Sequence, residues 1–254
     1  MNAQTEAPGS AGPGLARFID HTLLNPLATR AEVTRLCEEA RTHGFAAVCV
    51  HPVWVRHAAH ELEGSSVAVA TVVGFPLGAT ESAIKAREAE QAITHGATEL
   101  DMVARLGSIR EHDWRTVEAD IRAVVQAAAG RALVKVILET AALEPVEIVA
   151  GALAAREAGA GYVKTSTGFH PAGGASPAAV ALLRLAVGDA LGVKASGGIR
   201  SCEDAFRMIA AGASRIGTSS GVELVACGGS PPPSLLATLE RAGFPSPGAP
   251  RPGA

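Results

Sequence analysis

Three lysines and one aspartate stand inside or at the ends of short apolar runs, where charged side chains are unusual. They are Asp101 in "TELDMV", Lys135 in "LVKVILET", Lys164 in "GYVKTST" and Lys194 in "GVKASGG". The lysines are 29 and 30 residues apart, about one strand-plus-helix unit, so neighbouring strands would each direct a lysine towards a common space. A single lysine of this kind could simply extend from a strand edge into solvent, but the group as a whole indicates a shared site.

Crowding of this kind changes the chemistry of a lysine. An isolated lysine has a pKa near 10.4, so almost none of it is the neutral nucleophile at pH 7. A second ammonium group about 6 Å away, at an effective dielectric near 20, destabilises the charged form by about 2.8 kcal/mol, or roughly two pKa units. Burial acts in the same direction. One lysine could then form a Schiff base for a metal-independent aldol cleavage, while the aspartate moves protons. The spacing leaves open which lysine attacks.

Two glycine-bearing turns follow the last two apolar runs, "KASGGIRSCED" and "RIGTSSGVEL". Glycine lets the backbone approach an anion closely, and the N–H groups at a helix start attract negative charge. Tight turns that bind nothing are the alternative interpretation, and the arginine in the first turn favours a phosphate site. The candidate phosphate-binding residues in these turns are Gly197, Gly198, Arg200, Gly217, Ser219 and Ser220.

The elements that must position these residues alternate along the chain, because β-branched runs are followed by Ala/Glu/Arg-rich stretches with helical spacing. We predict strands at residues 17–20, 46–50, 66–73, 99–103, 132–138, 161–164, 192–195 and 215–217. We predict helices at residues 30–42, 53–61, 81–94, 113–128, 145–158, 177–187 and 202–210.

Eight strand–helix units of this size predict an α/β fold, a single (β/α)8 TIM barrel, whose active site lies at the carboxyl ends of the strands. A closed barrel has no strand edges, so charges within its strands mostly face the interior. The loops after its seventh and eighth strands are also the usual phosphate position. A doubly wound open sheet is the alternative, disfavoured because no G-x-G-x-x-G follows the first strand.

Composition excludes several classes of protein. The 254 residues are 48% hydrophobic, enough for a large core, and the net charge of −3 offers no basic surface for nucleic acid or anionic lipid. No apolar run approaches the roughly 18 residues of a membrane helix. The four cysteines are scattered without a C-x-x-C pair, so we expect a reduced, cytoplasmic protein without structural disulfides.

The two ends of the chain differ in composition from its middle. Residues 1–14 are small and polar, and residues 228–254 are rich in Gly and Pro apart from one helix-like piece, Ser234–Arg241. We expect disordered tails at both ends and a catalytic barrel domain at residues 15–227.

The order of these motifs resembles the deoxyribose-phosphate aldolase family. The blocks that carry the resemblance, from about residue 18 to residue 220, are "IDHTLLNP", "VCVHP", "VVGFPLGA", "ELDMV", "VKVILET", "YVKTSTGF", "VKASGGIR" and "RIGTSSG". The resemblance implies a (β/α)8 barrel that reversibly cleaves 2-deoxy-D-ribose 5-phosphate to D-glyceraldehyde 3-phosphate and acetaldehyde, without metal or cofactor. It implies small-molecule partners only, with neither nucleic acid nor membrane, and a homo-oligomer, which we expect to be a dimer.

The resemblance also assigns roles. Lys164 matches the Schiff-base lysine, Lys194 the lysine that perturbs it, Asp101 the aspartate that relays protons through water, and Lys135 a further lysine of the same network. The matching substrate-binding positions are Asp20, Thr22, Cys49, Thr167, Gly197, Gly198, Arg200, Gly217, Ser219 and Ser220.

One segment departs from the family pattern, because "ARLGSIREHD" follows the aspartate block in place of the usual continuation.

Two other functions stay open. One is a related Schiff-base or transaldolase-like enzyme acting on a keto-sugar phosphate. The other is a catalytically silent sugar-phosphate sensor, against which the intact Lys164, Lys194 and Asp101 argue.

Overall fold

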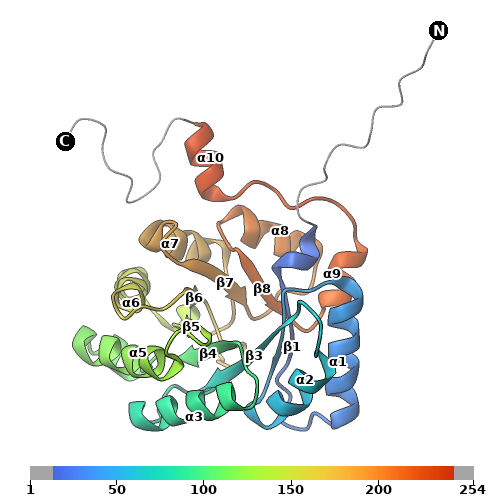
Figure 1. The fold of residues 1–254 in the computed structure, drawn as a ribbon. Coiled ribbons are helices and arrows are strands. Elements are labelled where there is room, and N and C mark those ends of the chain that lie inside the picture. Colours follow the sequence, from blue (N-terminus) through green and yellow to red (C-terminus); the bar gives the residue numbers. More distant parts are fainter. Residues whose placement is uncertain (1–13, 243–254) are drawn as a thin grey trace.

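The computed structural model describes residues 14–242, and its centre is a closed barrel of parallel strands (Figure 1). The strands are β1 Ile19–Leu23, β2 Ala47–Val50, β3 Ala68–Val73, β4 Glu99–Val103, β5 Leu133–Ile137, β6 Tyr162–Lys164, β7 Gly192–Ser196 and β8 Arg215–Thr218. Each strand pairs with the next, and β8 pairs with β1. The predicted (β/α)8 barrel is therefore confirmed, and this closing pair excludes the open sheet.

Helices cover the outside of the barrel, except the last, which lies beyond it at the end of an extended segment (Figure 1). They are α1 Arg30–His43, α2 Val55–Glu61, α3 Ser82–Thr94, α4 Leu106–Arg110, α5 Trp114–Ala128, α6 Pro145–Glu157, α7 Pro177–Val187, α8 Cys202–Ala210, α9 Gly221–Ala226 and α10 Leu235–Arg241. The predicted helices of the barrel agree with these bounds to within two residues at either end. The sequence analysis missed α4 and α9, because five and six residues are too few to show a helical period.

The strand β1 differs from its predicted bounds at residues 17–20. Leu15–Phe18 forms a short 3-10 helix, and the strand begins at Ile19 and runs on to Leu23. It extends this far because Thr22 pairs with Cys49 of β2 and Leu23 with Val50. Since side chains alternate along a strand, the longer β1 places two polar residues, at positions 20 and 22, on its inner side.

The alternation of side chains also separates the core from the site. Val136, Val163 and Val193 face outward from β5, β6 and β7 and belong to the main hydrophobic core, packed between the strands and the helices. A lysine lies directly beside each of these valines in the sequence. The lysines therefore face the barrel interior, as their position within apolar runs predicts.

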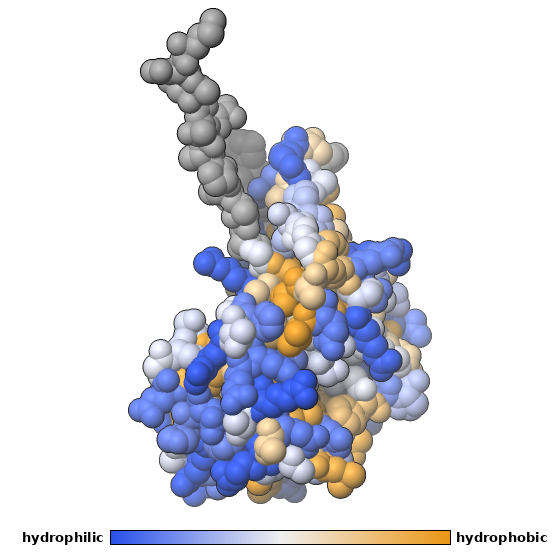
Figure 2. Space-filling view, turned by 90° about the vertical axis from the view of Figure 1, so that its right-hand side faces the viewer, coloured by the Kyte–Doolittle hydropathy of each residue, from blue (hydrophilic) through white to orange (hydrophobic). Residues whose placement is uncertain are grey.

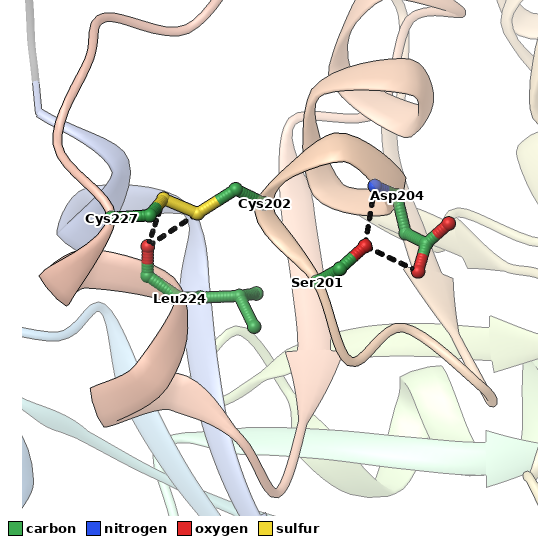
Figure 3. The surroundings of a disulfide bond; sticks show 5 residues. All are labelled: Ser201, Cys202, Asp204, Leu224 and Cys227. Carbon is green, nitrogen blue, oxygen red and sulfur yellow. Dashed lines mark hydrogen bonds between the residues drawn. A yellow bond between two sulfur atoms is a disulfide. The ribbon is translucent and has the colours of Figure 1, made fainter.

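Local capping explains where the helices begin. At α1, the Thr29 side chain accepts the Glu32 N–H, and the Glu32 carboxylate accepts the Thr29 N–H at 2.7 Å, which is a capping box. At α8, Ser201 accepts the Asp204 N–H, and its hydroxyl donates to the Asp204 carboxylate at 2.7 Å (Figure 3). This is an acidic variant of the capping box, in which the aspartate carboxylate bonds the serine hydroxyl instead of the serine N–H.

Residues 1–13 and 243–254, which are nearly all of the predicted N-terminal tail and the last part of the predicted C-terminal tail, lie outside the described residues. The division into barrel and tails therefore stays a prediction. Within the described part, α10 occupies the predicted helical piece, with Ser234 as its N-cap. None of the described helices combines the length and apolar character that crossing a membrane requires. The face in Figure 2 is mostly hydrophilic, with hydrophobic areas scattered between charged residues.

A disulfide bond corrects the expectation drawn from the cysteines. Cys202, the first residue of α8, is joined to Cys227, which follows α9, and their Cα atoms are 6.6 Å apart (Figure 3). The sulfur atoms lie 3.0 and 2.9 Å from the backbone oxygen of Leu224. The pair is 25 residues apart, so no local spacing rule reveals it. The fold brings it together because α8, β8 and α9 form consecutive, adjacent elements.

We expect the Cys202–Cys227 bond to stabilise the barrel by about 3 kcal/mol, the loss of unfolded-chain entropy for a closed loop of this size. Chemical reduction or Cys227→Ser should lower the free energy of unfolding by this amount, measured by urea denaturation with and without a reducing agent. Cys227→Ser is the matched control, since its stability should not respond to the reducing agent. Equal stability of both proteins under both conditions would contradict the prediction.

Candidate active site

The three predicted lysines converge on Asp101. Lys135 donates to Asp101 Oδ1 at 2.7 Å, and Lys164 and Lys194 donate to Oδ2 at 2.8 and 2.6 Å. The strand register explains this arrangement, because Lys164 pairs with Lys194, whereas Lys135 lies two residues deeper on β5. All four side chains are buried. The common space inferred from the lysine spacing therefore exists.

The network extends beyond these four residues. Asp20 Oδ2 lies 2.5 Å from Lys194 Nζ, and Glu99 Oε2 lies 2.5 Å from Lys135 Nζ. Arg215 closes the network by pairing with Asp20 at 2.5 Å and with Glu99 at 2.9 Å. The sequence analysis missed Glu99 and Arg215. Both are the first residue of their strand, so each looked like an ordinary charged strand end.

The charges of this network balance without Lys164. Asp20, Glu99 and Asp101 are three carboxylates, and three cations (Lys135, Lys194 and Arg215) pair with them. A proton on Lys164 would leave one uncompensated positive charge in a buried site, which is unfavourable. The arrangement therefore favours the neutral amine on Lys164 and the charged form on the other two lysines.

The pKa shifts of the lysines follow the same pattern. Burial lowers the pKa of Lys164, and the Lys194 ammonium lowers it further, although Asp101 acts in the opposite direction. Burial also disfavours the charged forms of Lys194 and Lys135, but the carboxylates outweigh burial and raise the pKa of both. The sequence analysis named the second ammonium as the main cause. In the structure, burial is the larger cause.

The pKa values of the two aspartates are lowered, although burial by itself would raise them. Burial alone would raise the pKa of Asp20, but Lys194, Lys135 and Arg215 lower it to about 2. The three lysines likewise hold the pKa of Asp101 well below its usual range, again against burial. Both carboxylates therefore stay ionised at neutral pH, and Asp101 keeps its lysine partners in place.

A cavity of about 480 Å³ opens at Lys164. The predicted residues that line it are Thr22, Lys164, Thr167, Gly197, Gly198, Arg200, Gly217 and Ser219. Asp20 and Cys49 are fully buried and Ser220 lies at the start of α9, so these three are not part of the lining. The cavity has further lining residues that the sequence analysis did not predict, namely Leu23, Leu24, Asn25, Pro26, Gly168, Phe169, Ser196, Ile199 and Thr218.

One wall of this cavity is suited to an anion. No hydrogen bond among the described residues engages the backbone N–H groups of Gly168, Gly197, Gly198 or Ser219, although all four residues line the cavity. Arg200 lies beside them, exposed and without an ion pair in the described part of the chain. Free amides and a guanidinium are groups that favour the binding of an anion such as phosphate.

The packing around Gly217 leaves no room for a side chain at this position. A Cβ atom at this position would lie 2.3 Å from Oγ of Ser196 and 3.0 Å from Cε of Lys194, so a larger residue would displace both side chains. This close approach explains one of the glycines that the sequence analysis assigned to phosphate binding.

Two other predicted residues are engaged within the protein. The Thr22 hydroxyl donates to the Asp20 backbone oxygen at 2.9 Å, and the Thr167 hydroxyl donates to Glu139 at 2.5 Å. Cys49 lies beside the charged network, where burial and Asp101 raise the pKa of its thiol. Cys49 is therefore a neutral neighbour of the lysines.

Comparison with known proteins adds to this geometry. Residues 15–226 match the profile of the DeoC/LacD family aldolases. The chain belongs to this family. Among the curated relatives of this DeoC/LacD aldolase, deoxyribose-phosphate aldolase of Lysinibacillus sphaericus is 54% identical over 210 residues, 83% of this chain and 94% of the relative. The enzyme of the same name from Bacillus subtilis is 53% identical over 211 residues, again 83% and 94% of the two chains.

Solved structures agree with the family assignment. The tetrameric deoxyribose phosphate aldolase of Aeropyrum pernix has a TM-score of 0.77 and 38% identity, covering 84% of this chain and 89% of that chain. A protein described as QR15, an aldolase, has a TM-score of 0.79 and 37% identity, covering 84% and 94%. As a DeoC/LacD aldolase, the chain is a lyase.

Proposed function

We propose that this DeoC/LacD aldolase reversibly cleaves 2-deoxy-D-ribose 5-phosphate to D-glyceraldehyde 3-phosphate and acetaldehyde through a metal-independent Schiff base on Lys164. The observation that carries the proposal is the position of Lys164. Of the three buried site lysines, it alone has a lowered pKa and lines the cavity. The names of the relatives support the substrate.

The first step is imine formation. The neutral Lys164 amine attacks C1 of the open-chain sugar aldehyde, and loss of water gives a protonated imine. Lys194 and Lys135 keep their protons because Asp20 and Asp101 stabilise the two ammonium groups. These lysines therefore contribute charge and hydrogen bonds, and Lys164 contributes the nucleophile.

The second step breaks the C2–C3 bond. The electron pair of this bond moves into the protonated imine to give an enamine, while the C3 hydroxyl loses its proton through water to Asp101 and becomes the aldehyde of glyceraldehyde 3-phosphate. Because the lysines hold the pKa of Asp101 low, the carboxylate passes the proton on, by way of water, to C2 of the enamine. Hydrolysis of the resulting imine releases acetaldehyde and restores the Lys164 amine.

The phosphate group fits the anion-binding wall of the cavity. The free amides of Gly197, Gly198 and Ser219, with Arg200, would bind it, which places the other end of the sugar at Lys164. Phosphate binding far from the reacting atoms orients the substrate for attack.

The direct test is an assay of the purified protein with 2-deoxy-D-ribose 5-phosphate, after EDTA treatment, with separate detection of acetaldehyde and glyceraldehyde 3-phosphate. We expect equal amounts of the two products and no cleavage of keto-sugar phosphates. Cleavage of a keto-sugar phosphate alone would indicate the transaldolase-like enzyme. Binding of the substrate without cleavage would indicate the sensor.

The partners and location of the protein stay predictions. We propose a homodimer, supported by the exposed apolar side chains of Leu27, Val53 and Leu77. The substrates are small molecules, and the composition argues against nucleic acid as a partner. A cytoplasmic location follows from the proposed metabolic role, although the disulfide bears on it, since such bonds are rare in a reducing cytosol.

A further inference from the structure

Glu139 is a buried acid that the proposed mechanism does not use. It follows β5 and is the N-cap of a short 3-10 helix, and its side chain is fully buried. Its backbone has φ 58° and ψ 54°, the left-handed region that is unfavourable for a residue with a Cβ atom. A residue kept in this conformation must be held there by its surroundings, a situation that is frequent at functional sites.

The contacts of Glu139 all lead to one residue of the cavity wall. Its Oε2 accepts the Thr167 hydroxyl at 2.5 Å, and both carboxylate oxygens lie 3.3 Å from the Thr167 backbone nitrogen, which donates to them. No other donor reaches this carboxylate within residues 14–242. Glu139 is thus dedicated to Thr167, which follows the Schiff-base lysine by three positions.

Thr167 in turn holds the next residues of the turn in place through a hydrogen bond to Phe169. Its hydroxyl oxygen accepts the Phe169 N–H at 3.1 Å, so both the proton and a lone pair of the hydroxyl are used inside the protein. Gly168, between these two residues, has φ 84° and an N–H group without a partner among the described residues. The turn Thr167–Phe169 therefore offers the cavity a backbone donor, and the Thr167 hydroxyl fixes the turn.

The two loops are also joined by their backbones. The Thr140 N–H donates to the Thr165 oxygen at 2.8 Å, and the Leu138 N–H donates to the Lys164 oxygen at 3.0 Å. The β5 loop that carries Glu139 therefore runs directly alongside the end of β6. Glu139 is held at a fixed distance from the turn, as a positioning role requires.

From this geometry we propose that Glu139 is a positioning residue for phosphate recognition. It orients the Thr167–Phe169 turn so that the Gly168 N–H joins the free amides of Gly197 and Gly198 at the substrate phosphate. Gly168 and Gly197 are close enough for this, since a Cβ on Gly168 would lie 3.6 Å from the Gly197 Cα. The inference rests on the proposed function, whose substrate carries the phosphate.

The test separates geometry from charge with two substitutions. Glu139→Gln keeps an oxygen that accepts the Thr167 hydroxyl and removes a negative charge near the phosphate. Glu139→Ala removes the acceptor. We expect Glu139→Ala to weaken inorganic phosphate binding, measured by calorimetry, by about tenfold, which corresponds to loss of one restraining hydrogen bond to a charged group. Glu139→Gln should bind phosphate at least as tightly as the wild type.

Kinetics provide the second measurement. Glu139→Ala should raise KM for 2-deoxy-D-ribose 5-phosphate about tenfold with little change in kcat, and it should leave kcat/KM for unphosphorylated 2-deoxyribose unchanged. Thr167→Val removes the hydroxyl that links Glu139 to the Phe169 N–H, so it should raise KM at least as much. Adding Glu139→Ala to Thr167→Val should then raise KM no further.

The outcomes distinguish this inference from the function on which it rests. Borohydride trapping of acetaldehyde uses no phosphate, so a wild-type protein that is not trapped would refute the proposed function. If the wild type is trapped, phosphate binding by Glu139→Ala equal to that of the wild type would overturn the role of Glu139. Equal losses with phosphorylated and unphosphorylated substrates, or a Glu139→Gln variant as weak as Glu139→Ala, would overturn it too.

Discussion

Replacement of Lys164 by leucine is expected to abolish both turnover and covalent capture of acetaldehyde. The side chain lines the cavity and supplies the only site amine with a lowered pKa, so its loss removes the proposed nucleophile. We expect kcat to fall by about 10⁴-fold or more, the scale found when a covalent nucleophile is removed. The measurement is treatment with acetaldehyde and borohydride, which should add one ethyl group to wild-type Lys164 and none to the variant.

The sequence makes this experiment unusually clean. The chain has only four lysines, and three of them belong to the site. The fourth, Lys85, is fully buried outside the barrel interior, where its ammonium lies 2.7 Å from Asp120. Peptide mapping after trapping therefore has few possible sites, and Lys85 is an internal control that should stay unlabelled. An ethyl group on Lys135 or Lys194 of the wild type would contradict the assignment of Lys164.

The sequence was sufficient to predict the barrel and the position of the lysine cluster because both depend on regular spacing. One strand–helix unit separates each site lysine from the next, so once the barrel was predicted, the lysines were expected to lie on neighbouring strands and face the same space. The same criterion, a charge inside an apolar strand, applies to Glu99 and Arg215. They were missed because a charge on the first residue of a strand is common, and only the register shows that these two side chains face the barrel interior.

Two other features depend on contacts that no local pattern encodes. The Cys202–Cys227 bond joins two helices across an intervening strand, and scattered cysteines in a chain of this composition are typical of reduced proteins. Glu139 adopts a left-handed backbone although glutamate has no preference for it, and its proposed role depends on a partner 28 residues away. Such residues are identified only after the loops have been placed.

Removal of the Lys194 charge is expected to shift the pH dependence of the enzyme towards alkaline pH. In Lys194→Leu, three carboxylates would face two cations, and protonation of Lys164 would restore the balance. The pKa of Lys164 should therefore rise, because the ammonium that lowered it is gone while Asp101 still raises it. Since only the neutral amine attacks, the acidic limb of the kcat/KM profile should move up by about two pH units, and activity at pH 7 should fall roughly a hundredfold or more.

Two matched variants decide whether charge is the cause. Lys194→Arg keeps the positive charge, so it should keep the acidic limb near its wild-type position even where altered geometry lowers the maximal rate. Asp20→Asn removes a negative charge that lies 2.5 Å from Lys194, so it should move the limb in the opposite direction, towards acidic pH. If the limb of Lys194→Leu coincided with that of the wild type, the charge balance would not control Lys164. Lys194 would then act through the geometry of its contacts with Asp101 and Asp20, which the leucine also removes.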